Sequence, residues 1–144
     1  MDEASGDLVA AAVTTNDLSD GQLLPELLDQ IDEAIGQVSA DGAYDTRACY
    51  AAISACQAHA GIPPRRGARI WQHGNANELP LARDENLRCL RRIRRQAWKR
   101  ACGYHRRSLA ETTMFRIKTI FGARVRARTF DGQSAEVLIG CVAR

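Results

Sequence analysis

The stretch that decides the fold is QVSADGAYDTRACYAAISACQAHAGIPP, which spans residues 37–64. Gln37–Ala40 has the composition and flanking residues of a short strand. Asp45, or the threonine that follows it, can cap a helix over residues 46–60. Gly61–Pro64 ends that helix and is typical of a brief edge strand. The stretch therefore predicts a strand-helix-strand unit.

Two further elements are predicted before this unit. Residues 7–15, DLVAAAVTT, are typical of a strand bounded by turn-forming residues. Apolar residues then recur at helical spacing, and Ser19 or Asp20 can cap the helix, which tolerates Pro25 only near its start. Those apolar positions are Leu24, Leu27, Leu28, Ile31 and Ile35. The order β-α-β-α-β predicts an α/β fold with a small sheet.

The second half of the chain is predicted to be mainly helical. Residues 65–83 contain Gly, Pro, Asn and His and indicate a surface loop. A basic helix is expected over residues 85–101 and a second helix over 106–121. An extended segment with alternating Arg over 124–129 and a last helix capped by Asp131 follow. The buried stripe of the basic helix is predicted to consist of Leu87, Leu90, Ile93, Ala97 and Trp98.

The charge of the chain is divided sharply along its length. Residues 1–60 hold one Arg against eleven Asp and Glu, a balance of −10. Residues 61–128 hold eighteen Lys and Arg against four acids, a balance of +14, and sixteen of those basic residues are Arg. This span is either a solvated face balanced by the acidic third or a surface for polyanions. We favour nucleic acid as the partner, because the guanidinium fork suits phosphate.

The composition is that of an ordinary globular protein, with 45% hydrophobic and 26% charged residues. There is no run of about 18 apolar residues, so no membrane partner is expected, and the acidic start carries no secretory signal. Five cysteines without a CxxC pair fit free thiols in a cytoplasmic protein better than disulfides. Cys56 and His59 have a ligand-like spacing, but no second pair follows to complete a zinc site.

One group of polar residues has the spacing of a functional site. Tyr104, Arg107, Glu111 and Lys118 fall within an arc of about 60° on a helix that advances 100° per residue. A Glu with an Arg four residues before it is often only an ion pair on a solvated face. Helix geometry alone leaves both interpretations open.

The wider sequence resembles bacterial insertion-sequence transposases of the DDE class. Tyr104, Arg107, Glu111 and Lys118 match the signature Y-x2-R-x3-E-x6-K, within GYHRRSLAETTMFRIKTIFG. The words ADGAYDTRACY resemble the segment that carries the family's second catalytic aspartate, which falls on Asp41. IPPRRGAR and TTNDLSDGQLLPELLDQI also look like that family, so the resemblance covers nearly the whole chain.

The resemblance implies an RNase H-like fold, here incomplete, with a small mixed sheet flanked by helices, a basic helical insertion and C-terminal helices. It implies that Asp41 and Glu111 are catalytic and bind Mg²⁺ or Mn²⁺, since these ions prefer hard oxygen ligands. It further implies that Tyr104, Arg107 and Lys118 contact DNA. Asp45 is expected to cap a helix instead of binding metal.

The chain departs from the family's pattern at its amino terminus. The family's first catalytic aspartate lies on a first strand followed by two more strands, and residues 1–17 have room for at most two. The first strand, its aspartate and the DNA-end-binding region are therefore expected to be missing, and Asp2 is a poor substitute. We expect either an inactive transposase fragment, or a DNA-binding fragment that regulates an intact transposase, or a decayed reading frame. A homo-oligomer is also open, because a missing strand exposes a sheet edge.

Overall fold

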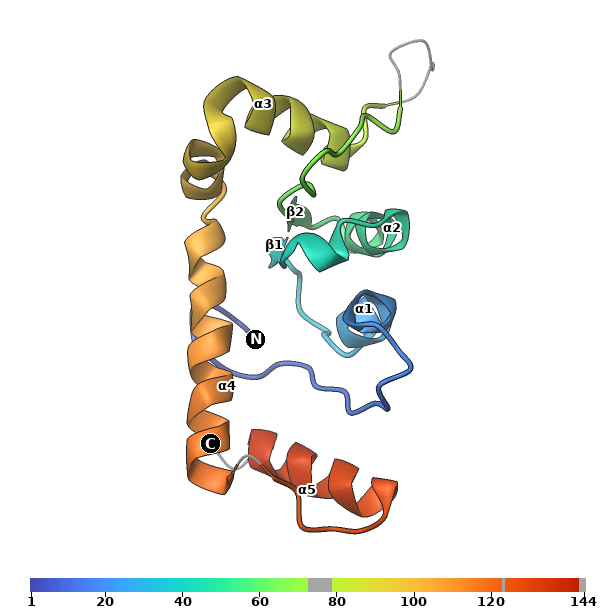
Figure 1. The fold of residues 1–144 in the computed structure, drawn as a ribbon, viewed down its shortest axis with the longest axis vertical. Coiled ribbons are helices and arrows are strands. Elements are labelled where there is room, and N and C mark those ends of the chain that lie inside the picture. The colour runs from blue at the N-terminus through green and yellow to red at the C-terminus, as the bar shows by residue number, and fades with distance from the viewer. Residues whose placement is uncertain (73–78, 123, 143–144) are drawn as a thin grey trace.

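The computed structural model describes residues 1–72, 79–122 and 124–142. These residues form five α-helices, two short 3-10 helices and two strands, arranged as a small α/β unit from which the second half of the chain extends (Figure 1). The elements are α1 (Asp20–Asp29), β1 (Gln37–Ser39), η1 (Gly42–Tyr44), α2 (Arg47–Ala55), β2 (His59–Gly61), α3 (Ala82–Ala101), η2 (Tyr104–Arg107), α4 (Ser108–Phe121) and α5 (Phe130–Val142).

The predicted strand-helix-strand unit is confirmed, but its second strand lies at His59–Gly61 instead of Gly61–Pro64. β1 and β2 pair in parallel, with Val38 opposite Ala60, and α2 is the connection between them. The side chain of Thr46 caps α2 by accepting a hydrogen bond from Cys49 N at 3.2 Å. The helix ends at Ala55 instead of reaching residue 60, because Gln57 adopts a φ of 57° and turns the chain into β2. The expected mixed sheet is thus a two-stranded parallel one among the described residues.

The predicted strand over residues 7–15 is wrong, since the structure shows no regular element there. A strand needs the backbone of a neighbour, and β1 is paired only with β2 among the described residues. The N–H of Ala11 is instead bonded to the side chain of Gln30. Strand-forming composition without a pairing partner therefore leaves this segment as coil.

α1 begins as predicted but is shorter. Ser19 and Gln22 form a capping box at its start, and Pro25 lies inside the helix. The helix ends at Asp29, so Ile31 lies beyond it in the connection to β1. The main core lies between α1, α2 and β2. Its buried residues are Leu24, Leu28, Cys49, Tyr50, Ile53, Ala60 and Ile62.

A buried polar cluster joins this core to the start of α3. Arg83 Nε lies 3.0 Å from Asp45 Oδ1, and Arg83 Nη1 lies 3.2 Å from Asp84 Oδ1. Asp84 also accepts hydrogen bonds from Trp71 N at 3.0 Å and Gln72 N at 2.8 Å. The guanidinium of Arg83 lies over the Trp71 ring, 4.2 Å from its centroid. We call Asp45, Trp71, Arg83 and Asp84 the Arg83 cluster.

The charges of the Arg83 cluster are balanced by its contacts. Burial opposes the ionisation of Asp84, but two backbone N–H groups and the Arg83 guanidinium outweigh it and lower the pKa of that carboxyl. Residues 65–72 and 79–81 carry no helix or strand, as predicted, whereas Arg83 belongs to α3 and is buried. Residues 73–78 of the predicted loop lie outside the described residues.

α3 is sharply bent at Arg94, whose φ of 68° and ψ of 156° are not helical (Figure 1). The bend breaks the predicted apolar stripe, because the two halves of the helix present different faces. Leu87 and Trp98 are buried, whereas Leu90 and Ile93 are half-buried and Ala97 is exposed.

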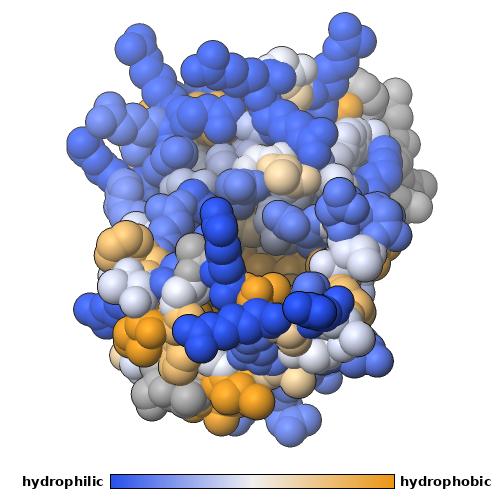
Figure 2. Space-filling view, turned by 60° about the horizontal axis from the view of Figure 1, so that its bottom comes forward, coloured by the Kyte–Doolittle hydropathy of each residue, from blue (hydrophilic) through white to orange (hydrophobic). Residues whose placement is uncertain are grey.

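Much of the apolar surface of α4 and α5 is exposed. Phe115 and Ile120 of α4 are 70% and 71% exposed, and Ile139 of α5 is 65% exposed. Figure 2 shows hydrophobic patches between hydrophilic side chains when this end of the molecule is turned forward.

The last predicted helix is confirmed as α5, but Asp131 lies inside it and does not cap it. The hydroxyl of Thr129 accepts the hydrogen bond from Gly132 N at 3.3 Å instead. Residues 124–129 carry no helix or strand. None of the described helices is long and apolar enough to cross a membrane.

The Arg83 cluster generates a stability prediction. Arg83→Met should lower the free energy of unfolding by about 3–5 kcal/mol, because it leaves two buried carboxylates without their cation. Arg88→Met is the matched control on the same helix. Its ion pair with Glu85 has side chains that are 43% and 56% exposed, so the loss should be below about 1 kcal/mol. Urea unfolding measures both, and equal losses would contradict the assigned role of Arg83.

Candidate metal and DNA site

Asp41 lies just after β1 and begins the η1 turn. Its Oδ1 accepts a hydrogen bond from Ala43 N at 2.8 Å, so the carboxylate caps the turn. The residue is half-buried, and Gly42 lies beside the carbonyl of Pro63. One capping bond leaves most of the acceptor capacity of Asp41 available for a ligand.

Asp45, at the other end of the turn, does not have its predicted role. Thr46 caps α2, whereas the Asp45 carboxylate is buried against Arg83 and accepts a hydrogen bond from Arg65 N at 2.9 Å. The expectation that Asp45 caps the helix is therefore wrong. The buried guanidinium attracts the carboxylate more strongly than the end of the helix does.

Tyr44, within the same turn, is half-buried in the core. Burial raises the pKa of its phenol, and the nearby charges of Asp20 and Asp41 raise that pKa further. Tyr44 therefore stays neutral over the physiological pH range and supports the turn as an apolar residue.

Glu111 lies in the first turn of α4 and pairs with Arg107. Glu111 Oε1 is 2.7 Å from Arg107 Nη2, and the Glu111 side chain is 62% exposed. Lys118 lies two turns further along the same helix and is exposed. The prediction that Glu111 and Lys118 lie on one helix is confirmed.

Tyr104 and Arg107 belong to η2 and not to α4, so the four signature residues do not share one continuous helix. Gly103 has a φ of 66° and starts this 3-10 turn after α3. Cations surround the Tyr104 ring, with Lys99 Nζ 4.6 Å and Arg107 Cζ 5.5 Å from its centroid. Tyr104 is thereby placed next to the guanidinium that pairs with Glu111.

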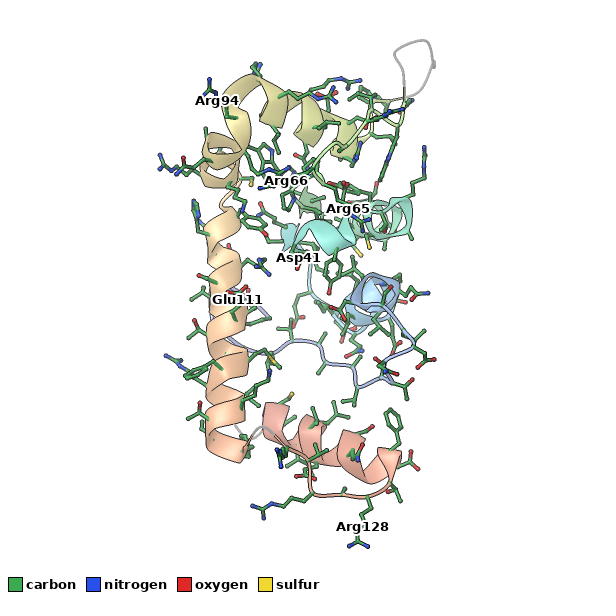
Figure 3. All side chains as sticks on the ribbon, in the orientation of Figure 1. Asp41, Arg65, Arg66, Arg94, Glu111 and Arg128 are labelled. Atoms are coloured by element: carbon green, nitrogen blue, oxygen red, sulfur yellow. The ribbon has the colours of Figure 1, made fainter. Side chains whose placement is uncertain are left out.

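β1 and the start of α4 are connected in space. Gln37 of β1 donates a hydrogen bond from its side chain to Cys102 O at 3.0 Å. Residues 36–39, Arg107 and Ala110 line one open cavity of about 810 Å³. Figure 3 shows Asp41 at the start of η1 and Glu111 on α4. The cavity thus lies beside β1 and the start of α4, but neither Asp41 nor Glu111 lines it.

The donor chemistry fits a hard divalent cation, but the described residues contain no group of three His, Cys, Asp or Glu side chains placed to hold a metal. Asp2 lines the cavity, but its carboxylate accepts a hydrogen bond from Ser5 N. Mg²⁺ is often bound by one or two carboxylates, completed by water and substrate phosphates. Asp41 and Glu111 fit this mode. The pair of Cys56 and His59 belongs to no such group either.

Two residues of the site were not found by sequence reasoning. Arg65 donates hydrogen bonds from its side chain to Gly42 O and Ala43 O, which fixes the turn that Asp41 begins. Arg83 holds Asp45 at the end of the same turn. Arg83 and Asp84 stand between the predicted loop and the predicted basic helix. Such a charged pair looks the same in the sequence whether it is exposed or buried.

The comparison with known proteins identifies the family. The family model described as the transposase DDE domain matches residues 1–144. The chain therefore belongs to the transposase DDE domain family. No solved structure matches the chain.

Proposed function

We propose that this chain is a partial DDE transposase domain in which Asp41 and Glu111 are two carboxylate ligands of a divalent metal. The observation that carries the proposal is the presentation of Asp41 by a capped turn after β1. Glu111 lies on α4 next to Ala110, which lines the same cavity as the residues of β1. When bound, Mg²⁺ or Mn²⁺ would supply the charge stabilisation that phosphodiester cleavage and strand transfer require.

The residues around Glu111 supply the positive charge that a DNA strand needs. Arg107 pairs with Glu111 and contacts the Tyr104 ring, so it holds both side chains in place. Lys118 is exposed on the same helix and makes no ion pair among the described residues. In this proposal Arg107 and Lys118 bind phosphates beside the scissile bond, and Tyr104 packs against the strand.

We propose that the isolated chain does not cleave DNA. The candidate metal site has two carboxylates among the described residues, whereas the family resemblance implies three. The two-stranded sheet of the described residues offers no further strand to carry a third. Two carboxylates hold the metal loosely and leave the reacting phosphate poorly oriented.

The prediction is that supercoiled plasmid stays intact when it is incubated with the chain and Mg²⁺ or Mn²⁺. Glu111→Gln is the control variant, because Glu111 is exposed and its loss should cost less than about 1 kcal/mol of stability. A metal-dependent nick that disappears in Glu111→Gln would show that two carboxylates are sufficient and would contradict this proposal.

A second candidate function is metal-independent DNA binding that regulates an intact transposase. The observation that favours it is a set of exposed arginines along α3, of which Arg91 also donates a hydrogen bond to Ala68 O. This set comprises Arg91, Arg92, Arg94 and Arg100. Figure 3 shows Arg94 at the outer side of the bend, away from Asp41. Such a surface binds phosphates without base contacts and needs no metal.

If each of these four arginines contacts one phosphate, DNA affinity should fall about a hundredfold between 50 and 200 mM salt. Fluorescence anisotropy of a labelled duplex in EDTA measures this dependence. Arg92→Gln together with Arg100→Gln should flatten the salt dependence. Arg47→Gln is the control outside α3 and should leave the salt dependence unchanged, although its guanidinium lies 5.0 Å from the centroid of the Trp71 ring. Binding that is insensitive to salt would rule out this function.

A further inference from the structure

The peptide group between Gly42 and Ala43 is held at both of its polar ends. Its N–H, on Ala43, donates to Asp41 Oδ1 at 2.8 Å. Its carbonyl oxygen, on Gly42, accepts from Arg65 Nε at 2.8 Å. One peptide plane thus lies between the Arg65 guanidinium and the Asp41 carboxylate. Hydrogen bonds in such a chain polarise one another, so the cation strengthens the bond to the carboxylate.

Arg65 makes two more contacts with the same turn. Its Nη2 donates to Ala43 O at 2.9 Å, so the planar fork holds two successive carbonyls. Its backbone N–H donates to Asp45 Oδ2 at 2.9 Å. Asp45 is in turn fixed by the buried Arg83. The turn is therefore held along its whole length by a residue 22 or 23 positions away in the chain.

We propose that Arg65 is the positioning residue of Asp41, fixing the direction of its carboxylate through the Gly42–Ala43 peptide. The proposal rests on the proposed function, in which that carboxylate is a metal ligand. Arg65 itself does not contact the metal or the reacting phosphate. A short 3-10 turn has poor hydrogen-bond geometry of its own, so its conformation depends on such an external clamp.

Arg66 provides a matched comparison. It is the next residue, is exposed, and makes no hydrogen bond or ion pair within the part of the chain that the structure describes. Figure 3 shows Arg65 and Arg66 together above the turn that Asp41 begins. Removing either guanidinium changes the local charge equally, but only the removal of Arg65 breaks the clamp.

The test is amide hydrogen exchange, measured by NMR on the full chain without metal. Arg65→Met should accelerate exchange of the Ala43 amide about tenfold or more, because two charge-assisted bonds to the turn are lost. Arg66→Met should leave that amide unchanged, and amides within α2 should be unaffected in both variants. Equal acceleration in the two variants, or none in Arg65→Met, would overturn the proposal.

Arg65→Lys keeps the positive charge but loses the planar guanidinium with its two donors. This variant provides the test if Arg65→Met fails to fold. It should still accelerate Ala43 exchange, because an ammonium cannot hold both carbonyls in the same geometry. Ala43 exchange that is unchanged in Arg65→Lys would show that charge alone is sufficient and would also overturn the clamp.

A second readout separates the clamp from the proposed metal site. Loss of a group that orients a ligand lowers metal affinity about 10- to 100-fold, so Mn²⁺ affinity should fall by this factor in Arg65→Met but not in Arg66→Met. Asp41→Asn is the reference. If Asp41→Asn leaves Mn²⁺ affinity unchanged, the proposed metal site fails, and the exchange data alone decide on the clamp. If Asp41→Asn abolishes binding but Arg65→Met binds normally, the positioning role is overturned.

Discussion

The structure depends on the contact between Arg83 and Asp45, a buried ion pair that joins α3 to the strand-helix-strand unit. The apolar core covers α1, α2 and β2, but it does not extend along α3. The Arg83 cluster supplies a buried polar connection, because Asp84 binds the backbone of residues 71 and 72 while Arg83 reaches Asp45. Asn86 adds a buried hydrogen bond from its side chain to Ala60 O at 2.8 Å. A buried cation between two carboxylates tolerates little displacement, so the start of α3 is fixed relative to the turn of Asp41.

The candidate site depends on this polar framework more than on the sheet. Two paired strands of three residues give little independent stability, and they cannot by themselves fix a carboxylate two residues beyond β1. Arg65 and Asp45 hold the η1 turn, and Arg83 holds Asp45. Glu111 has no comparable support, since its described ion pair is the exposed contact with Arg107. The site thus combines a carboxylate fixed by the η1 turn with one held only by an exposed ion pair, which is consistent with weak metal binding in the isolated chain.

The sequence predicted the elements that are determined by residues close together in the chain. β1, the start of α2, α5 and the spacing of Arg107 and Glu111 all follow from caps, strand flanks and helical periodicity. The failures involve partners far apart in the chain. Residues 7–15 have strand composition but no strand beside them, and Asp45 binds a residue 38 positions away instead of capping its own helix. The bend at Arg94 has no local signal, because Arg is a good helix former.

The central claim is that Asp41 and Glu111 belong to one metal site, although they lie on separate elements of the fold. An NMR titration with Mn²⁺ tests it most directly, because the bound ion broadens the amide signals of nearby residues. The account predicts that the amides of Gly42 and Ala43 and those of Glu111 and Thr112 broaden together over the same range of Mn²⁺ concentration, and that Asp41→Asn abolishes both effects. Broadening at only one of the two segments, or at both with different midpoints, would contradict a shared site.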